Sequence, residues 1–213
     1  MRHRRRGRKL GRNPNHQRAL LRNLASALIL TERDAEGEDN APKVKGRIIT
    51  TIQKAKEVRP LVERCITIAR DALPRQEEAE KLAPDAERHS DKWRAWRASD
   101  QWREWTQAMA PVVAARRRAL RLLGNKQAVK VLFDEIAPRF ADRNGGYTRV
   151  LRLPKPRLGD AGTRAILELV GKNDRVRKKA VRPSFDTDET AEDKSTPSVS
   201  QSDEDAPAET PAE

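Results

Sequence analysis

The sequence predicts an α+β protein with a small two-layer body, in which helices pack on a short three-stranded sheet. Apolar residues recur at helical spacing in three segments, 14–30, 52–72 and 126–137. Three shorter segments, 47–51, 147–153 and 165–170, have the length and composition of strands. Because a three-stranded sheet is small, we expect all the helices to pack on the same one of its two faces.

Composition limits the size of this body and indicates its kind of partner. The chain has 213 residues, of which 45 are Lys or Arg and 32 are Asp or Glu, giving a formal net charge of +13. Hydrophobic residues make up only 36%, so the core must be small for this length. The sequence pI of about 10.3 favours a polyanionic partner, nucleic acid before membrane.

The charge is segregated along the chain. Residues 1–30 carry nine Arg or Lys and no carboxylate, whereas residues 184–213 carry ten carboxylates and one Lys. The acidic segment is rich in Ser, Thr and Pro, so we expect it to be disordered. Residues 172–183 are predicted to leave the fold as a basic stretch. Residues 1–12 are expected to be a basic arm that a polyanion orders, because Gly7 and Gly11 punctuate it and it has no apolar face.

The first half of the body is predicted as helix, loop, strand and helix. Asn13 and Pro14 mark a helix start, and the helix should run to about Leu30. Its apolar stripe is expected to comprise Leu20, Leu24, Ala27 and Leu28, flanked by Leu21 and Ala25, with Arg18 and Arg22 on the opposite face. Residues 31–45 are predicted to be a solvated loop. The helix over 52–72 should bury Ala55, Val58, Val62, Cys65 and Ala69, and Pro60 should kink or restart it. Cys65 is interpreted as a core residue, with a reactive thiol as the alternative.

Residues 73–113 are predicted to be a helical insertion rich in Trp. Pro74 and Pro84 break the chain, and two Trp pairs follow, 93/96 and 102/105. A single straight helix would place the pairs on opposite sides, whereas a second helix capped at Ser99 would let both face inward. The Trp side chains either cover a small core or stack on bases or a protein neighbour.

The body resumes in residues 114–171, which complete the domain begun by residues 13–72. The helix over 126–137 should bury Val129, Leu132, Phe133 and Ile136 and stop at Pro138. A turn at 144–146 then leads into the strand 147–153, with Tyr147, Leu151 and Leu153 expected on one side. An exposed loop at 154–164 precedes the last strand.

The sequence lacks the patterns of common catalytic and cofactor sites. The three histidines, His3, His16 and His89, have no metal-ligand spacing, and the single Cys adds none. Phosphate-binding glycine loops and a Gly-x-Ser-x-Gly motif are also missing. Apolar runs are too short to span a membrane, and Arg22 and Asn23 interrupt the only stretch that is similar to a secretory signal. We therefore expect a cytoplasmic protein that is not an enzyme, with no cofactor, metal or small-molecule substrate and no membrane association.

Several blocks closely resemble the family of ribosomal protein seventeen of the bacterial large subunit. They are MRHR at 1–4, GRKL at 7–10, RN at 12–13, His16, LRNL at 21–24, ITT at 49–51, KAKE at 54–57, ITIA at 66–69, LFDEIAPRF at 132–140, RNGGYTRVL at 143–151 and the strand at 165–170. The loop 31–45, the segment 73–113 and the residues after about 175 depart from the family pattern.

The resemblance implies a structural component of the large ribosomal subunit, with a compact α/β body near the exit of the nascent-chain tunnel. Its implied partners are large-subunit ribosomal RNA and neighbouring large-subunit proteins. The residues expected at the RNA are Arg2, His3, Arg4, Arg5, Arg6, Arg8, Lys9, Arg12, Asn13, His16, Arg18 and Arg22, and second to these Lys54, Lys56, Arg139, Arg143, Tyr147 and Arg149. Four of these residues have an alternative interpretation. Arg139 and Arg149 would be ordinary surface charges, Asn13 would only cap its helix, and Tyr147 would be a core residue.

A DNA-binding architectural protein of the nucleoid type is the alternative function, because a basic arm alone does not distinguish RNA from DNA. No DNA-reading helix or dimer seam is recognisable in the sequence, which argues against it. An RNA-modifying enzyme ranks third. Co-sedimentation with large subunits or with nucleoid at moderate salt separates the first two.

The acidic segment 184–213 is either a solvated extension or a competitor of RNA for the basic arm, and the charge of +22 on residues 1–183 motivates the second interpretation. Truncation after Pro183 should then raise affinity for scrambled RNA more than for ribosomal RNA. Filter binding at two salt concentrations measures this difference. Equal affinities of the two chain lengths for scrambled RNA at low salt would leave the segment a solvated extension.

Overall fold

The structure is a computed structural model that describes residues 7–35 and 37–171. The first half of the predicted basic arm, residues 1–6, lies outside this range. So do the predicted basic stretch 172–183 and the predicted disordered segment 184–213.

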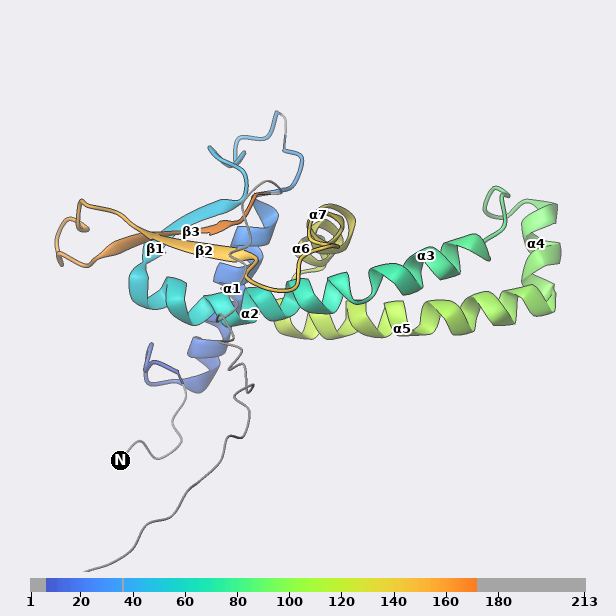
Figure 1. The fold of residues 1–213 in the computed structure, drawn as a ribbon, viewed down its shortest axis with the longest axis horizontal. Helices are drawn as coiled ribbons and strands as arrows, with labels where there is room; N and C mark the ends of the chain where they lie inside the picture. Colours follow the sequence, from blue (N-terminus) through green and yellow to red (C-terminus); the bar gives the residue numbers. More distant parts are fainter. Residues whose placement is uncertain (1–6, 36, 172–213) are drawn as a thin grey trace, which may run out of the picture. The chain divides into compact units, whose positions relative to one another are not determined.

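The described residues combine a set of helices with one small sheet, as expected for an α+β body (Figure 1). In chain order they are α1 (Pro14–Leu30), β1 (Arg47–Thr51), α2 (Ile52–Arg70), α3 (Leu73–Lys81), α4 (Asp91–Ala98), α5 (Asp100–Leu123), α6 (Lys126–Val131), the π-helical turn η1 (Leu132–Ile136), α7 (Ala137–Arg139), β2 (Thr148–Arg152) and β3 (Arg164–Leu169). The predicted three-stranded sheet and the helix predicted over 14–30 are confirmed, and the helix predicted over 52–72 is present but ends at Arg70. Residues 31–45 form neither helix nor strand where they are described, as predicted.

The three strands form one antiparallel sheet in the order β1-β3-β2. Ile48, Leu167 and Val150 lie opposite one another across it and belong to the core or pack on it. The prediction for β2 was wrong about the face: Leu151 is 40% exposed, and Val150 packs inward instead. Because side chains alternate along a strand, Val150 and Leu151 must face opposite sides, and the burial of Thr148 fixes which side is inward.

The core lies between the sheet and the helices. Helix α2 packs against all three strands and against α1 and α5 (Figure 1). The stripe predicted for α2 is confirmed, since all five of its residues are fully buried. Pro60 does not restart this helix, which runs through it without a break. Cys65 lies in the core as interpreted, and burial raises the pKa of its thiol to about 12, which keeps it protonated and unreactive at neutral pH.

Helix α1 is rotated slightly from its predicted orientation. The buried residues are Ala25, Ser26, Leu28 and Ile29, while Ala27 is exposed. Ser26 tolerates burial because its hydroxyl donates a hydrogen bond of 3.0 Å to the carbonyl oxygen of Leu123 at the end of α5. The buried face of α1 is therefore turned toward α5. The sequence pattern did not indicate the hydrogen bond between Ser26 and Leu123.

The segment predicted as one helix over 126–137 is built from three pieces, α6, η1 and α7, and ends two residues later than predicted. Pro138 lies within α7. Proline has no backbone N–H to donate, so the regular hydrogen-bond pattern cannot continue through it, and the π-helical turn lies directly before α7. The four residues predicted to be buried here are buried.

Replacement of Phe133 by Ala should lower the free energy of unfolding by about 3–5 kcal/mol, because its ring is 2% exposed and removal leaves a cavity. Leu158→Ala is the matched control: this side chain is fully exposed and should contribute less than about 0.5 kcal/mol. Denaturant melts followed by far-UV circular dichroism measure both. Equal stability of the two variants would contradict the packing described here.

Candidate nucleic-acid interface

The described end of the basic arm, residues 7–12, lies against the start of α1 and the first turns of α2. Arg8 Nε lies 3.9 Å from Glu57 Oε2, and Gln17 Nε2 donates a 2.8 Å hydrogen bond to the carbonyl oxygen of Gly11. Gly7 has φ +92°, and a side chain there would come within 2.8 Å of Glu57 Oε1. The backbone conformation therefore favours glycine here, whereas the flexible Glu57 side chain can move away from an added Cβ atom. Arg8, Lys9 and Arg12 remain exposed.

The start of α1 is arranged to receive an anion. Asn13 caps the helix, its side-chain oxygen accepting a 2.8 Å hydrogen bond from the backbone N–H of Asn15. The first turn has no acidic residue, and His16 and Arg18 are exposed beside it. Helix N-termini favour negative charge, and positive side chains around one strengthen that preference. Asn13 thus caps α1, which was the alternative to RNA contact in the sequence analysis.

The basic face of α1 continues onto the end of α5. Arg22 Nη2 donates a 2.9 Å hydrogen bond to the carbonyl oxygen of Arg121. Arg18 and Arg22 line a groove of about 460 Å³ that is closed on its other side by Leu123 and Gly124. The two helices therefore present their positive side chains next to each other.

Sequence reasoning missed the contribution of α5 and α6. Between Thr106 and Phe133 the chain has no carboxylate and carries six cations: Arg116, Arg117, Arg118, Arg121, Lys126 and Lys130. This acid-free run was as visible in the sequence as the arm, and only the structure shows that it packs beside α1. Arg117 and Lys126 line one groove between α5 and α6, and Arg117 and Arg121 are one helical turn apart. We call Arg18, Arg22, Arg117, Arg121 and Lys126 the basic helix surface.

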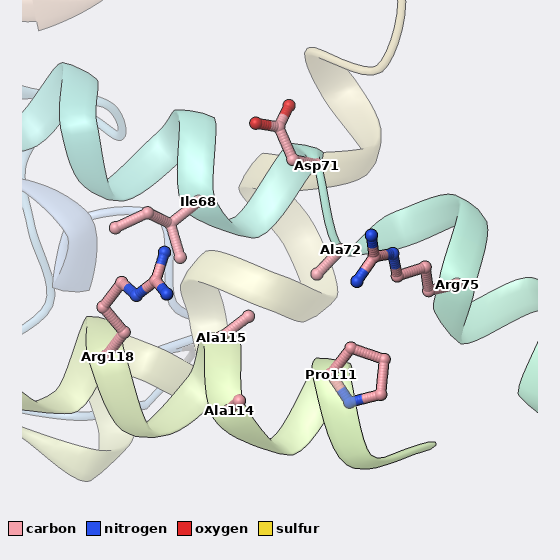
Figure 2. Close-up of a pocket in the computed structure, with 8 residues that line it drawn as sticks. All are labelled: Ile68, Asp71, Ala72, Arg75, Pro111, Ala114, Ala115 and Arg118. Carbon is pink, nitrogen blue, oxygen red and sulfur yellow. The ribbon is translucent and has the colours of Figure 1, made fainter. Parts of the chain in front are cut away.

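A second group of cations lies at a cleft between α5 and the junction of α2 with α3 (Figure 2). Its volume is about 300 Å³, and Arg118 and Arg75 reach into it from α5 and α3 above a floor of Pro111, Ala114 and Ala115. The only carboxylate among the residues that line it is Asp71, which pairs with Arg70 at 2.6 Å. Two guanidinium groups on a small apolar floor suit a phosphate with its sugar.

The second-tier residues fall into different environments. Lys56 is exposed, and Lys54 is half-buried in the first turns of α2. Arg139 Nη2 pairs with Glu32 at 2.8 Å and lies over the Phe140 ring, so it contributes to packing between the loop and α7. Arg149 pairs with Glu168 across β2 and β3 at 2.6 Å, and Arg143 Nε donates to the carbonyl oxygen of Gly145 at 3.4 Å.

Tyr147 is a core residue, the alternative interpretation from the sequence. Its side chain is 1% exposed and packs on Phe140, with ring centroids 5.2 Å apart. Its hydroxyl oxygen accepts a 3.0 Å hydrogen bond from Arg70 Nη1. A ring buried in this way cannot stack on a base, so we leave Tyr147 out of the interface.

Within residues 7–35 and 37–171, no group of three or more His, Cys, Asp or Glu side chains is arranged to hold a metal ion. In the same part of the chain, every helix is too short or too polar to cross a bilayer.

The chain matches a known protein family over most of its length. The family model described as ribosomal protein L17 matches residues 20–170, more than half of the chain. The chain belongs to the ribosomal protein L17 family. The resemblance identified from the sequence blocks is thereby confirmed.

Curated relatives agree over nearly the whole length. The large ribosomal subunit protein bL17 of Rhodopirellula baltica is 64% identical over 188 residues, covering 88% of this chain and 90% of the relative. Those of Nitratidesulfovibrio vulgaris and Koribacter versatilis are 38% and 35% identical, covering 79% and 91% of this chain. The family match also spans the Trp-rich segment, whose status as an insertion stays a prediction. Its expected boundary at 113/114 falls inside α5.

Proposed function

We propose that this member of the L17 family is a structural constituent of the large ribosomal subunit that binds ribosomal RNA through the arm and the basic helix surface. The observation that carries the proposal is the packing of α1 against α5 and α6, because these helices belong to two acid-free stretches of the sequence, residues 1–31 and 105–133. Like charges gathered in this way destabilise an isolated protein, and a polyanion offsets that repulsion.

The chemistry of the surface favours RNA phosphates. Four of its five cations are Arg, whose planar fork pairs with two phosphate oxygens at once. The N-terminus of α1 and the Arg75–Arg118 cleft add two more places for phosphate. The proposed contacts in the described residues are Arg8, Lys9, Arg12, His16, Arg18, Arg22, Arg75, Arg117, Arg118, Arg121 and Lys126. Arg2, His3, Arg4, Arg5 and Arg6 extend the proposal into the arm.

The proposal includes the setting that the family resemblance implies. The protein would act in the cytoplasm, within the ribosome and near the exit of the nascent-chain tunnel, beside other large-subunit proteins. No catalytic step forms part of this function. Its role is to neutralise and hold RNA, for which an exposed basic surface on a rigid body is sufficient.

Deletion of residues 2–12 should flatten the dependence of log affinity on log salt by about 5–6 units, if each of its seven cations neutralises one phosphate. Filter binding to large-subunit ribosomal RNA across a salt series measures the slope. An unchanged slope would show that the arm does not contact RNA.

The double variant Arg18→Gln, Arg117→Gln should flatten the same slope by about 1.5 units, because it removes one exposed cation from each of the two packed helices. The matched control is Arg94→Gln, Arg103→Gln, which removes the same charge from exposed positions on α4 and α5. The control should leave the slope unchanged. Equal effects of the two double variants would mean that net charge alone, and not this surface, drives binding.

A further inference from the structure

Three Trp side chains pack together where α4 meets α5. Trp102 and Trp105 stack with ring centroids 5.0 Å apart, and the Trp96 ring meets each of them edge-on, at 5.1 and 5.7 Å. Ser99 ends α4 and begins α5, which is one of the two arrangements considered from the sequence. Because the chain turns there, both Trp pairs line the same pocket.

Mutual packing does not close this cluster. All four Trp residues are only half-buried, and none of them belongs to the core of the body. The pocket that they form is open and has a volume of about 280 Å³, and its other lining residues are Ala83, Pro84, Ala86 and Arg88. Its walls are therefore mainly indole rings that the fold itself does not fully cover.

The charges at the pocket itself are positive. Arg88 is the only charged residue in its lining. The Arg97 guanidinium lies over the rings of Trp93 and Trp102, 5.2 and 5.3 Å from their centroids. Residues 77–104 include eight carboxylates, but none of them lines the pocket. The local charge therefore favours an anionic ligand.

These two Arg side chains are not neutralised by neighbouring carboxylates. Within residues 7–35 and 37–171, neither Arg88 nor Arg97 forms an ion pair, whereas Arg94 and Arg103 each pair with the Asp three residues earlier, at 3.3 and 3.2 Å. A ligand with both a flat ring and a negative charge would use the indole walls and the guanidinium groups together. A nucleotide has both parts, since its base stacks on aromatic rings and its phosphate pairs with Arg.

We propose that the pocket formed by Trp93, Trp96, Trp102 and Trp105 receives an unpaired base of single-stranded RNA, with the phosphate of that nucleotide at Arg88. Stacking requires no particular base, because every base has an aromatic face, so the pocket selects an unpaired nucleotide and not a sequence. An apolar protein side chain would fill the same walls but would leave the Arg88 guanidinium without an anionic partner.

The position of the pocket on α5 extends the proposed RNA contact away from the body. Arg118, in the Arg75–Arg118 cleft, and Trp105 are thirteen residues apart on this helix, which is about 20 Å along its axis. One RNA element that follows α5 would reach both. The inference goes beyond the proposed function, because it assigns a base to residues outside the arm and the basic helix surface.

The test follows the four indole N–H signals of ¹⁵N-labelled full-length protein by nuclear magnetic resonance. The probe is a single-stranded RNA of about six adenosines, and the control is a ribose-phosphate chain of the same length without bases. We expect saturable shifts of the indole signals with the RNA, and affinity at least about tenfold weaker at these signals for the chain without bases.

Trp93→Ala should weaken RNA binding at the remaining indole signals about tenfold or more, since it removes one wall of the pocket. Arg88→Gln leaves all four indole rings in place. It should flatten the salt dependence of this binding by about 0.7 unit, the value for one phosphate contact of a single strand. Arg94→Gln is the matched control, because it removes the same charge from a residue that is paired with Asp91, and it should leave the slope unchanged.

Two outcomes would overturn the proposal. Equal binding of the two chains at the indole signals would reduce the interaction to phosphate charge alone. Saturable indole shifts with an uncharged proline-rich peptide, and none with the RNA, would show that the pocket holds a protein segment instead. The salt slopes of the arm and of the basic helix surface test the proposed function separately, so the failure of either proposal is recognised independently of the other.

Discussion

The contact between α1 and the end of α5 is the interaction on which the proposed interface depends. The last carbonyl groups of a helix carry partial negative charge and need hydrogen-bond partners. Here two side chains of α1 act as these partners. The Ser26 hydroxyl donates to the carbonyl oxygen of Leu123, and the Arg22 guanidinium donates to that of Arg121. Gly124, with φ +73°, ends the helix at this point and turns the chain into α6. Two positively charged helices can thus lie together because a polar end group of one is satisfied by the other.

This contact also separates the structural from the proposed binding role of the cations. Arg22 uses part of its hydrogen-bonding capacity within the fold. Arg139 and Arg149 likewise form ion pairs within the fold, with Glu32 and Glu168 respectively. Arg18 and Arg117 are exposed on neighbouring helices and are better placed to meet a ligand. The basic residues therefore form a graded set, in which those nearest the core hold the body together and those farther out are available for phosphate.

Much of the fold followed from local patterns. Helical periodicity located α1 and α2, and the asparagine cap and Pro14 placed the start of α1 correctly. Composition located the three strands within one or two residues. One error arose where tertiary contacts decide, since the inward face of β2 depends on which neighbours Thr148 and Val150 meet. The π-helical turn before Pro138 was also not predicted. The family resemblance identified the arm, but no local pattern indicated that the 106–133 run would pack beside it, because that contact joins residues about one hundred positions apart.

The strand order has a consequence for how the body accommodates the Trp-rich segment. The middle strand of the sheet, β3, is the last strand in the sequence. It pairs with the first strand, β1, so that Glu168 lies opposite Arg47. Everything between β1 and β3, including α3, α4 and α5, is one long loop with respect to that pairing. Loop-closure entropy grows only with the logarithm of length, so lengthening such a loop by about forty residues costs only about 0.4 kcal/mol. A segment that folds back on itself costs less still, because its two ends stay close together. The topology of the sheet thus permits a long excursion at this point with almost no loss of stability.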